Sequence, residues 1–225
     1  MPFIAKVLGK PLAKLATKIM LGNKIVSMDL EKKNIKHFAI KEAVFPFKRF
    51  PGVDTILGPE MRSTGEVMGI DKDFGMAFAK SQIAGGTKIP SKGSVFVSVK
   101  DSDKDKIIEP VSKLLSIGFD VYATDGTAEF FNSHNIKTKK INKVLQGSPH
   151  IVEMINEKKI SLVFNTTETP QAIKDSKSIR RYALETETPY YTTVSGANAA
   201  VMAIKAINNN KITIRTIQSY GNLLS

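Results

Sequence analysis

A four-residue stretch, Thr124–Thr127 with the sequence TDGT, has residue types that suit phosphate binding. Gly126 permits a tight turn, and the two threonine hydroxyls with the backbone amides of the turn can surround phosphate oxygens. The stretch follows an expected strand and begins an expected helix. Taken alone, it is equally typical of an ordinary strand-to-helix turn that threonine caps.

Three further polar stretches also follow expected strands. Asn142 and Lys143 offer an amide and a positive charge, although Lys143 could equally be a solvated surface lysine. Asn165–Thr167 (NTT) could hydrogen-bond a base or a ribose, or could cap a turn. Thr192–Gly196 (TTVSG) precedes another expected helix. Because ligands of doubly wound sheets bind where the strands end, the shared placement predicts an anion or nucleotide pocket.

Residues typical of reaction chemistry are scarce. The chain has no cysteine, which excludes thiol nucleophiles, disulfides and cysteine-based metal sites. Its three histidines (His37, His134 and His150) lack metal-ligand spacing, and the phosphate-loop pattern GxxxxGK[ST] is absent. Ser195 lacks the preceding glycine of a nucleophile elbow. We therefore predict no catalytic residue and no metal site in this chain.

The composition is that of a soluble globular protein. Of the 225 residues, 42% are hydrophobic and 24% are charged. The net charge of +12 divides into +6 on each side of the Gly86–Thr87 bond, so it forms no basic tail of the kind that binds nucleic acid. Apolar runs are too short to span a membrane, and no signal-peptide pattern follows Met1. These features predict a cytoplasmic protein with neither a nucleic-acid nor a membrane partner.

The second part of the chain, residues 87–225, predicts one α/β domain with a doubly wound, mostly parallel sheet. Strands and helices alternate there with short connections. Expected strands are residues 94–99, 119–123, 160–164 and a closing strand at 211–217, with a short strand before Asn142. Expected helices are residues 107–115, a helix starting at 128–132, 151–155, 171–184 and 196–207.

The first part, residues 1–86, does not predict an independent domain. A helix is expected from Pro11 to Met20, ending near Gly22, and an extended segment from Phe38 to Phe50. The large apolar side chains of Phe45, Phe47 and Phe50 have little local surface to pack against. This part is therefore expected to belong to a larger fold.

Several ordered stretches carry a resemblance to a known family. They are residues 57–69 (LGPEMRSTGEVMG), residues 47–54 (FKRFPGVD), residues 2–14 and Ile179–Arg181. Taken in the order in which they occur along the chain, they resemble the C-terminal end of carbamoyl-phosphate synthetase large chains. The resemblance implies that residues 1–86 are the tail of the second ATP-grasp half. It implies that residues 87–225 are a methylglyoxal-synthase-like (MGS-like) regulatory domain of Rossmann type.

The resemblance also implies what the parent enzyme does. It would be an ATP-dependent ligase that makes carbamoyl phosphate from bicarbonate, glutamine-derived ammonia and ATP, for arginine and pyrimidine synthesis. ATP and Mg²⁺ or Mn²⁺ would bind to the remainder of the large chain, and the ammonia would come from a small glutaminase subunit. This chain alone would hold no cofactor and would be inactive.

Effector sites follow from the same resemblance, position by position. The nucleotide effectors, of the uridine or inosine monophosphate type, would contact the residues matching Lys104, Thr124, Thr127, Lys143, Asn165 and Thr167, with Ser176 near the purine-nucleotide site. Ornithine would contact Glu42, Tyr190 and Thr192, together with residues upstream of this chain.

One position departs from the family pattern. Asp125 stands where close relatives have histidine, and a carboxylate beside a phosphate would repel it unless it points away or binds a cation. Two alternatives therefore stay open. One is a docking domain whose effector pocket has decayed. The other is a free-standing methylglyoxal-synthase-like lyase, although residues 144–148 (VLQGS) lack the aspartates that this chemistry needs.

Overall fold

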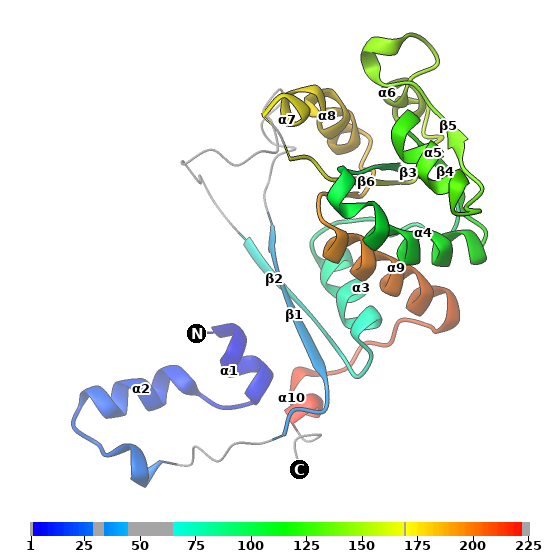
Figure 1. Cartoon of the computed structure of the whole chain (residues 1–225). Helices are drawn as coiled ribbons and strands as arrows, with labels where there is room; N and C mark the ends of the chain where they lie inside the picture. The colour runs from blue at the N-terminus through cyan, green and yellow to red at the C-terminus, as the bar shows by residue number, and fades with distance from the viewer. Residues whose placement is uncertain (1, 29–33, 45–64, 169, 222–225) are drawn as a thin grey trace.

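The computed structural model describes residues 2–28, 34–44, 65–168 and 170–221. Its main body is a five-stranded parallel sheet with the order β5-β4-β3-β6-β7, and helices lie on both faces (Figure 1). This is the doubly wound α/β fold that the alternating pattern predicts. The strands are β3 (Ser94–Ser98), β4 (Asp120–Ala123), β5 (Lys139–Lys140), β6 (Leu162–Asn165) and β7 (Tyr190–Tyr191).

Alternate residues of the strands build two separate cores, as expected for side chains that point to opposite faces. On one face, Val95 and Val97 of β3 pack with α4, α5 and α9. On the other face, Phe96 and Val163 pack with α6 and α8. The helices of the body are α4 (Lys104–Ser116), α5 (Asp125–Ser133), α6 (Ile151–Asn156), α7 (Pro170–Asp175), α8 (Lys177–Glu185) and α9 (Val194–Asn209).

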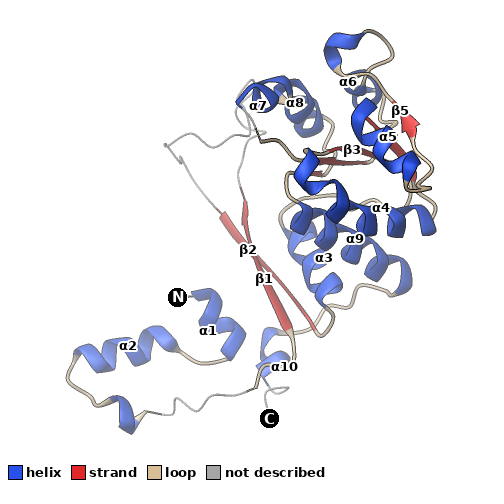
Figure 2. Ribbon diagram, viewed as in Figure 1, coloured by secondary structure: helices blue, strands red, loops and turns tan. Residues whose placement is uncertain are grey.

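The described residues of the N-terminal part form an antiparallel hairpin and three α-helices. Figure 2 shows the hairpin strands β1 (Phe38–Val44) and β2 (Gly65–Asp71) running between the α/β body and the N-terminal helices. The helices are α1 (Pro2–Leu8), α2 (Leu12–Met20) and α3 (Phe74–Ala84), and short 3-10 turns lie at Ile25–Ser27, Asp101–Asp103 and Val144–Gln146. Phe45, Phe47 and Phe50 lie outside the described residues.

Helix α3 packs on the α/β body although it precedes Thr87. A Cβ added to Gly75 of α3 would lie 2.4 Å from the Met202 carbonyl oxygen on α9, so the two helix backbones are in direct contact. A Cβ on Gly69 of β2 would lie 2.0 Å from the Ala77 carbonyl oxygen, so β2 and α3 are equally close. These contacts join the hairpin to the body.

The prediction of a closing strand at residues 211–217 is wrong. Residues 211–216 carry no secondary structure, and α10 (Ile217–Gly221) follows them. The alternating pattern there has no buried face, because Ile214 is 97% exposed and Ile212 is 44% exposed. Instead of joining the sheet, the segment leads to α10, whose Tyr220 hydroxyl donates to the Ile70 carbonyl of the hairpin (3.1 Å).

The single helix expected at residues 171–184 is two helices, α7 and α8, that meet at Ser176. The Ser176 hydroxyl donates to the Ala172 carbonyl oxygen (2.8 Å), and Ser176 itself is buried. The other expected helices and strands of residues 87–209 are present, within a few residues of their expected bounds.

Candidate functional site: a pocket at the strand ends

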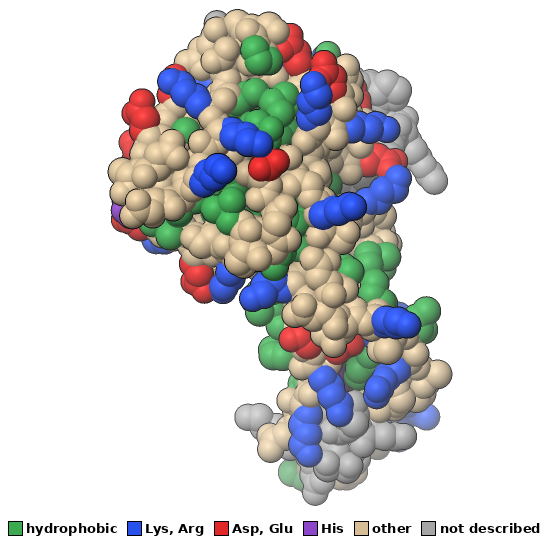
Figure 3. All heavy atoms as spheres, turned by 90° about the vertical axis from the view of Figure 1, so that its right-hand side faces the viewer, with side chains coloured by type: hydrophobic (Ala, Val, Ile, Leu, Met, Phe, Trp, Pro, Cys, Tyr) green, Lys and Arg blue, Asp and Glu red, His purple; other side chains and the backbone are tan. Residues whose placement is uncertain are grey.

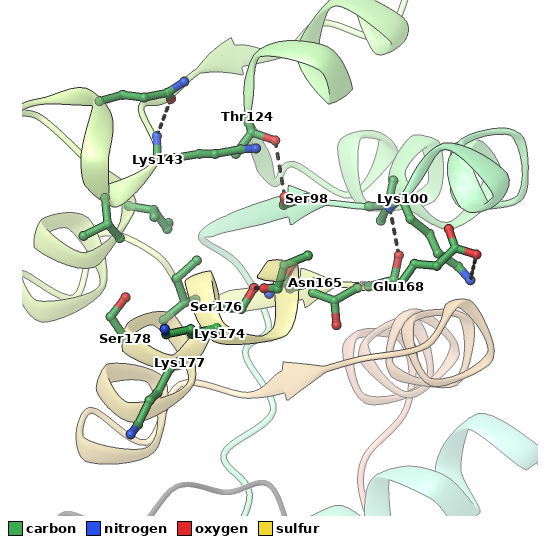
Figure 4. A pocket seen from close by; sticks show the side chains of 18 of the residues that line it. Ser98, Lys100, Thr124, Lys143, Asn165, Glu168, Lys174, Ser176, Lys177 and Ser178 are labelled. Atoms are coloured by element: carbon green, nitrogen blue, oxygen red, sulfur yellow. Dashed lines mark hydrogen bonds and ion pairs between the residues drawn. The ribbon is translucent and has the colours of Figure 1, made fainter. Parts of the chain in front are cut away.

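A cavity of about 810 Å³ lies at the carboxyl ends of β3, β4 and β6 (Figure 4). Its floor includes Ser98 at the end of β3, Thr124 directly after β4 and Asn165 at the end of β6. The chain leaves β3 towards β4 on one side and later returns to β6 on the other side. This is the switch point of the sheet, where doubly wound folds bind their ligands.

Thr124 lies at the cavity and Thr127 lies behind it. The Thr124 hydroxyl donates to the Ser98 hydroxyl (3.3 Å), and its extended backbone (ψ 158°) precedes the first turn of α5. Thr127 is 3% exposed, and its hydroxyl oxygen accepts from the Val99 amide (3.5 Å). Thr124 is therefore placed to contact a ligand, whereas Thr127 ties α5 to the end of β3.

Lys104 lies beside the TDGT turn but does not line the cavity. Its ammonium forms an ion pair with Asp101 (2.8 Å) and lies 5.7 Å from the centre of the Phe130 ring. It also lies 3.8 Å from the position that a Cβ on Gly126 would take. The charge is thus close to the first turn of α5, at the edge of the expected phosphate position.

Asp125, which the resemblance predicts to depart from the family pattern, is directed towards Lys140 of β5. Its carboxylate forms an ion pair with Lys140 on β5 (2.6 Å), and Asp125 is absent from the cavity lining. In this arrangement the carboxylate would not repel a phosphate bound in the cavity. Lys140 compensates the charge of this carboxylate.

Lys143 projects into the cavity from the segment after β5. Its backbone amide donates to the Gln146 side chain (2.8 Å), which fixes the turn, and Figure 4 shows its side chain extending towards Thr124. Within the described ranges, no carboxylate forms an ion pair with Lys143. Its charge is therefore free for an anion.

Asn165, Thr166 and Thr167 follow β6 in different roles. Asn165 is 3% exposed, and its amide group donates to the Tyr190 hydroxyl (2.6 Å). The Thr166 hydroxyl oxygen accepts from the Lys100 amide (3.1 Å), which fixes the loop after β3. Thr167 lines the cavity. The structure thus brings Thr124, Lys143, Asn165, Thr167 and Ser176 to one cavity.

The cavity also has a basic wall that sequence reasoning missed. Lys174, Lys177 and Arg181 from α7 and α8 line it, together with Lys100, which forms an ion pair with Glu168 (3.6 Å). In Figure 4, Lys177 is directed away from the strand ends. Counting Lys143, five basic residues and two acidic ones (Asp101 and Glu168) line the cavity, so an anion is favoured there. Nothing in the sequence of residues 170–181 marked this wall, because its place depends on how α7 meets α8.

Basic side chains also lie outside the cavity on the face shown in Figure 3. There, Lys and Arg side chains lie over both the α/β body and the narrower N-terminal part. Across the part of the chain that the structure describes, no group of His, Asp or Glu could hold a metal ion. No described helix is long and apolar enough to cross a membrane.

Of the three residues expected at an ornithine site, Glu42 and Tyr190 have different hydrogen-bond partners and Thr192 is exposed. Glu42 of β1 accepts hydrogen bonds from Ser81 (3.3 Å) and from the Gln82 amide group of α3. Burial raises the pKa of Glu42, and these two hydrogen bonds lower it by less. Tyr190 instead contacts Asn165, and Thr192 is exposed.

The residue beside Tyr190 is the one that connects with Glu42. The Tyr191 hydroxyl donates to the Gln82 side-chain oxygen (2.8 Å), and Gln82 in turn donates to Glu42. Burial, with a smaller effect of the Glu42 charge, raises the pKa of Tyr191. Sequence reasoning missed this residue because it matches no expected effector position.

Comparison with known proteins agrees with this architecture. Residues 106–192 match the family model described as "MGS-like domain". The chain is 50% identical over 225 residues to the carbamoyl phosphate synthase large chain of Rhizobium meliloti, and 48% identical over 220 residues to that of Methanobrevibacter smithii. Each match covers 97% of this chain. This chain is homologous to part of the carbamoyl phosphate synthase large chain. The resemblance expected from the sequence is thereby confirmed.

This chain corresponds to only one part of the much longer large chains. The chain spans only about a fifth of the length of these relatives, 19% for Rhizobium meliloti and 21% for Methanobrevibacter smithii. The MGS-like match contains Thr124, Lys143, Asn165 and Ser176, and therefore the centre of the cavity. Glu42 and the hairpin lie outside it, within the longer large-chain match.

Proposed function

We propose that the strand-end cavity is an effector site for a phosphorylated nucleotide, and that this chain regulates a carbamoyl-phosphate-forming synthetase. The observation that carries the proposal is the position of the Lys143 side chain, which extends towards Thr124 at the first turn of α5 and forms no ion pair with a carboxylate of the described residues. A nucleoside monophosphate such as uridine monophosphate (UMP) or inosine monophosphate (IMP) fits this combination.

The phosphate would lie between Lys143 and the first turn of α5. Backbone amides at a helix N-terminus point outwards and favour negative charge. Thr124 would donate its hydroxyl, and Lys104 would add a positive charge at the edge. The base and the ribose would then reach Asn165 and Thr167 on the next strand end.

The catalytic work would be done by the remainder of the large chain. Under the proposal, that remainder combines bicarbonate, ATP and ammonia from a glutaminase subunit, with Mg²⁺ or Mn²⁺, to supply arginine and pyrimidine synthesis. Residues 1–86 would be the tail of its second ATP-grasp half and residues 87–225 the regulatory domain. No described residue is assigned a catalytic role, and this chain alone would be inactive.

Regulation requires that the effector bind one conformation of the synthetase more tightly than another. Glu42, Tyr190 and Thr192 are the proposed ornithine contacts. Because Tyr190 already contacts Asn165, an ornithine bound there would meet the nucleotide site directly.

Isothermal titration calorimetry of the 225-residue chain with UMP and with IMP tests the binding step. We expect a saturable heat with at least one nucleotide, and a loss of affinity of about 10-fold or more in Lys143→Ala, since a bond between charged groups is lost. Lys92→Ala is the matched control, because Lys92 is an exposed lysine before β3, at the opposite end of the sheet. No heat with either nucleotide would refute the proposal, and so would equal losses in both variants.

A lyase acting on a small phosphorylated ketose is the second candidate. Two carboxylates, Asp101 and Glu168, line the same cavity and could take part in proton transfer. Phosphate release from dihydroxyacetone phosphate would identify this activity. If no phosphate is released at high protein concentration, the lyase candidate is excluded and the regulatory proposal remains.

A further inference from the structure

The edge strand β7 consists of two adjacent tyrosines whose side chains lie on opposite faces of the sheet. Tyr190 packs with the core formed by α6 and α8, whereas Tyr191 packs with the core formed by α4, α5 and α9. This alternation is the normal geometry of a strand. Here it gives each hydroxyl a different polar partner.

Tyr190 contacts the cavity. Strands β6 and β7 are paired in parallel, with Val163 opposite Tyr190 and Phe164 opposite Tyr191. This register brings the Tyr190 hydroxyl to Asn165, whose amide group donates to it (2.6 Å). Asn165 lines the cavity, so a ligand that engages this amide acts on the partner of Tyr190.

Tyr191 contacts the N-terminal part. Its hydroxyl donates to Gln82 of α3, and Gln82 donates to Glu42 of β1. Ser81, which is fully buried, donates to the same carboxylate (3.3 Å). The Tyr191 ring lies 6.1 Å from the Phe164 ring and 6.4 Å from the Phe78 ring, so packing holds it in place independently of its hydroxyl.

We propose that β7 couples the strand-end pocket to strand β1, with Tyr190 contacting Asn165 on one side and Tyr191 holding Gln82 and Glu42 on the other. The coupling to effector binding rests on the proposed nucleotide site. Tyr191 is a positioning residue in this proposal, because it touches neither the ligand nor a reacting atom. A ligand that immobilises Asn165 restrains the short edge strand. The restraint keeps the Tyr191–Gln82–Glu42 chain closed.

Hydrogen exchange of the 225-residue chain, with and without saturating UMP or IMP, tests the coupling. In the wild type, we expect the ligand to slow exchange of amides in β1 (38–44) and α3 (74–84) by about 5-fold or more, the lower end of typical coupling between sites. Tyr191→Phe should bind the nucleotide with unchanged affinity by calorimetry but lose this slowing. The ring contacts with Phe78 and Phe164 remain in that variant.

Tyr182→Phe is the matched control. It removes the same phenol oxygen from α8, beside the cavity, and the described structure gives the Tyr182 hydroxyl no hydrogen-bond partner. The control should keep both the nucleotide affinity and the ligand-induced slowing. Slowing that persists in Tyr191→Phe would overturn the proposal, and so would its absence in a wild type that binds nucleotide.

A second measurement needs no nucleotide and separates this proposal from the proposed function. Asn165→Ala, Gln82→Ala and the double variant are compared by urea unfolding. Side chains that share no partner and lie far apart contribute additively. If β7 couples them, the unfolding constant of the double variant should differ by about 2-fold or more from the product of the single effects. Additivity would refute the coupling even if nucleotides bind. If no nucleotide gives heat but the two substitutions are non-additive, the nucleotide site is refuted and the coupling through β7 is still supported.

Discussion

The close packing of α3 on α9 makes a quantitative prediction for Gly75→Ala. A Cβ on Gly75 would lie 2.4 Å from the Met202 carbonyl oxygen and 2.8 Å from its carbonyl carbon, whereas ordinary contacts begin near 3.4 Å. Both atoms belong to the backbone of α9, so no side chain can turn aside. The helices must separate by about 1 Å, the difference between 3.4 and 2.4 Å.

Overpacking of this kind costs about 1–3 kcal/mol. For a protein of this size, each kcal/mol lowers the melting temperature by about 2–4 °C, so Gly75→Ala should lower it by about 2–12 °C. Thermal unfolding followed by circular dichroism measures the shift. Gly85→Ala is the matched control, because the Gly85 backbone is right-handed (φ −75°) and the nearest atoms to an added Cβ lie at 3.4 Å.

The prediction also tests whether α3 unfolds together with residues 87–225. If α3 were a detachable part of the first 86 residues, the added methyl would release it and leave the main transition unchanged. A melting temperature of Gly75→Ala equal to that of Gly85→Ala would refute the reasoning. A larger loss in Gly75→Ala, within one cooperative transition, would support it.

Three further predictions concern the charged groups and the core. Burial raises the pKa of Glu42, so its protonated form is favoured in the folded state, and the contribution of Glu42 to stability should fall as pH rises from the ordinary carboxyl pKa through the raised one. Urea unfolding of the wild type and of Glu42→Gln between pH 4 and 7 should therefore show the wild type losing stability relative to the variant as pH rises, and a constant difference would contradict the assignment. Asp125→Asn should change nucleotide affinity less than about 5-fold in calorimetry, because the carboxylate pairs with Lys140, does not line the cavity, and belongs to an exposed pair of the kind worth about 1 kcal/mol or less; a larger gain in affinity would show that the carboxylate opposes the ligand. Phe131→Ala, at a fully buried site, should lower the unfolding free energy by about 3–5 kcal/mol in urea titration, and a loss below 1 kcal/mol would contradict the packing.

The sheet could be predicted from the sequence because its strands are short apolar runs that end in polar residues. The run at residues 94–98 gives a strand whose three central residues are buried, as expected for a parallel sheet covered on both faces. The same reasoning failed at residues 211–217, where alternation alone predicted a strand. Alternation describes a surface with one buried face, whereas Ile212 and Ile214 both remain exposed.

The candidate site could be predicted only where its residues follow a strand. Thr124, Lys143 and Asn165 meet that condition, and the parallel sheet brings them to one edge. The basic wall could not be predicted, since Lys174 and Lys177 come from helices whose meeting angle no local pattern encodes. The contact between Asn165 and Tyr190 depends on the register of β6 and β7, which sequence spacing alone does not give.

Because β7 has only two residues, the number of residues that precede it determines which tyrosine faces which side of the sheet. Inserting or deleting one residue between α8 and Tyr190 would turn Tyr190 to the face that Tyr191 now occupies. Both hydroxyls would then lose their partners, although the composition of the strand would hardly change. When homologous large chains are aligned, the spacing of this tyrosine pair from Asn165 should therefore be compared before the identity of either residue.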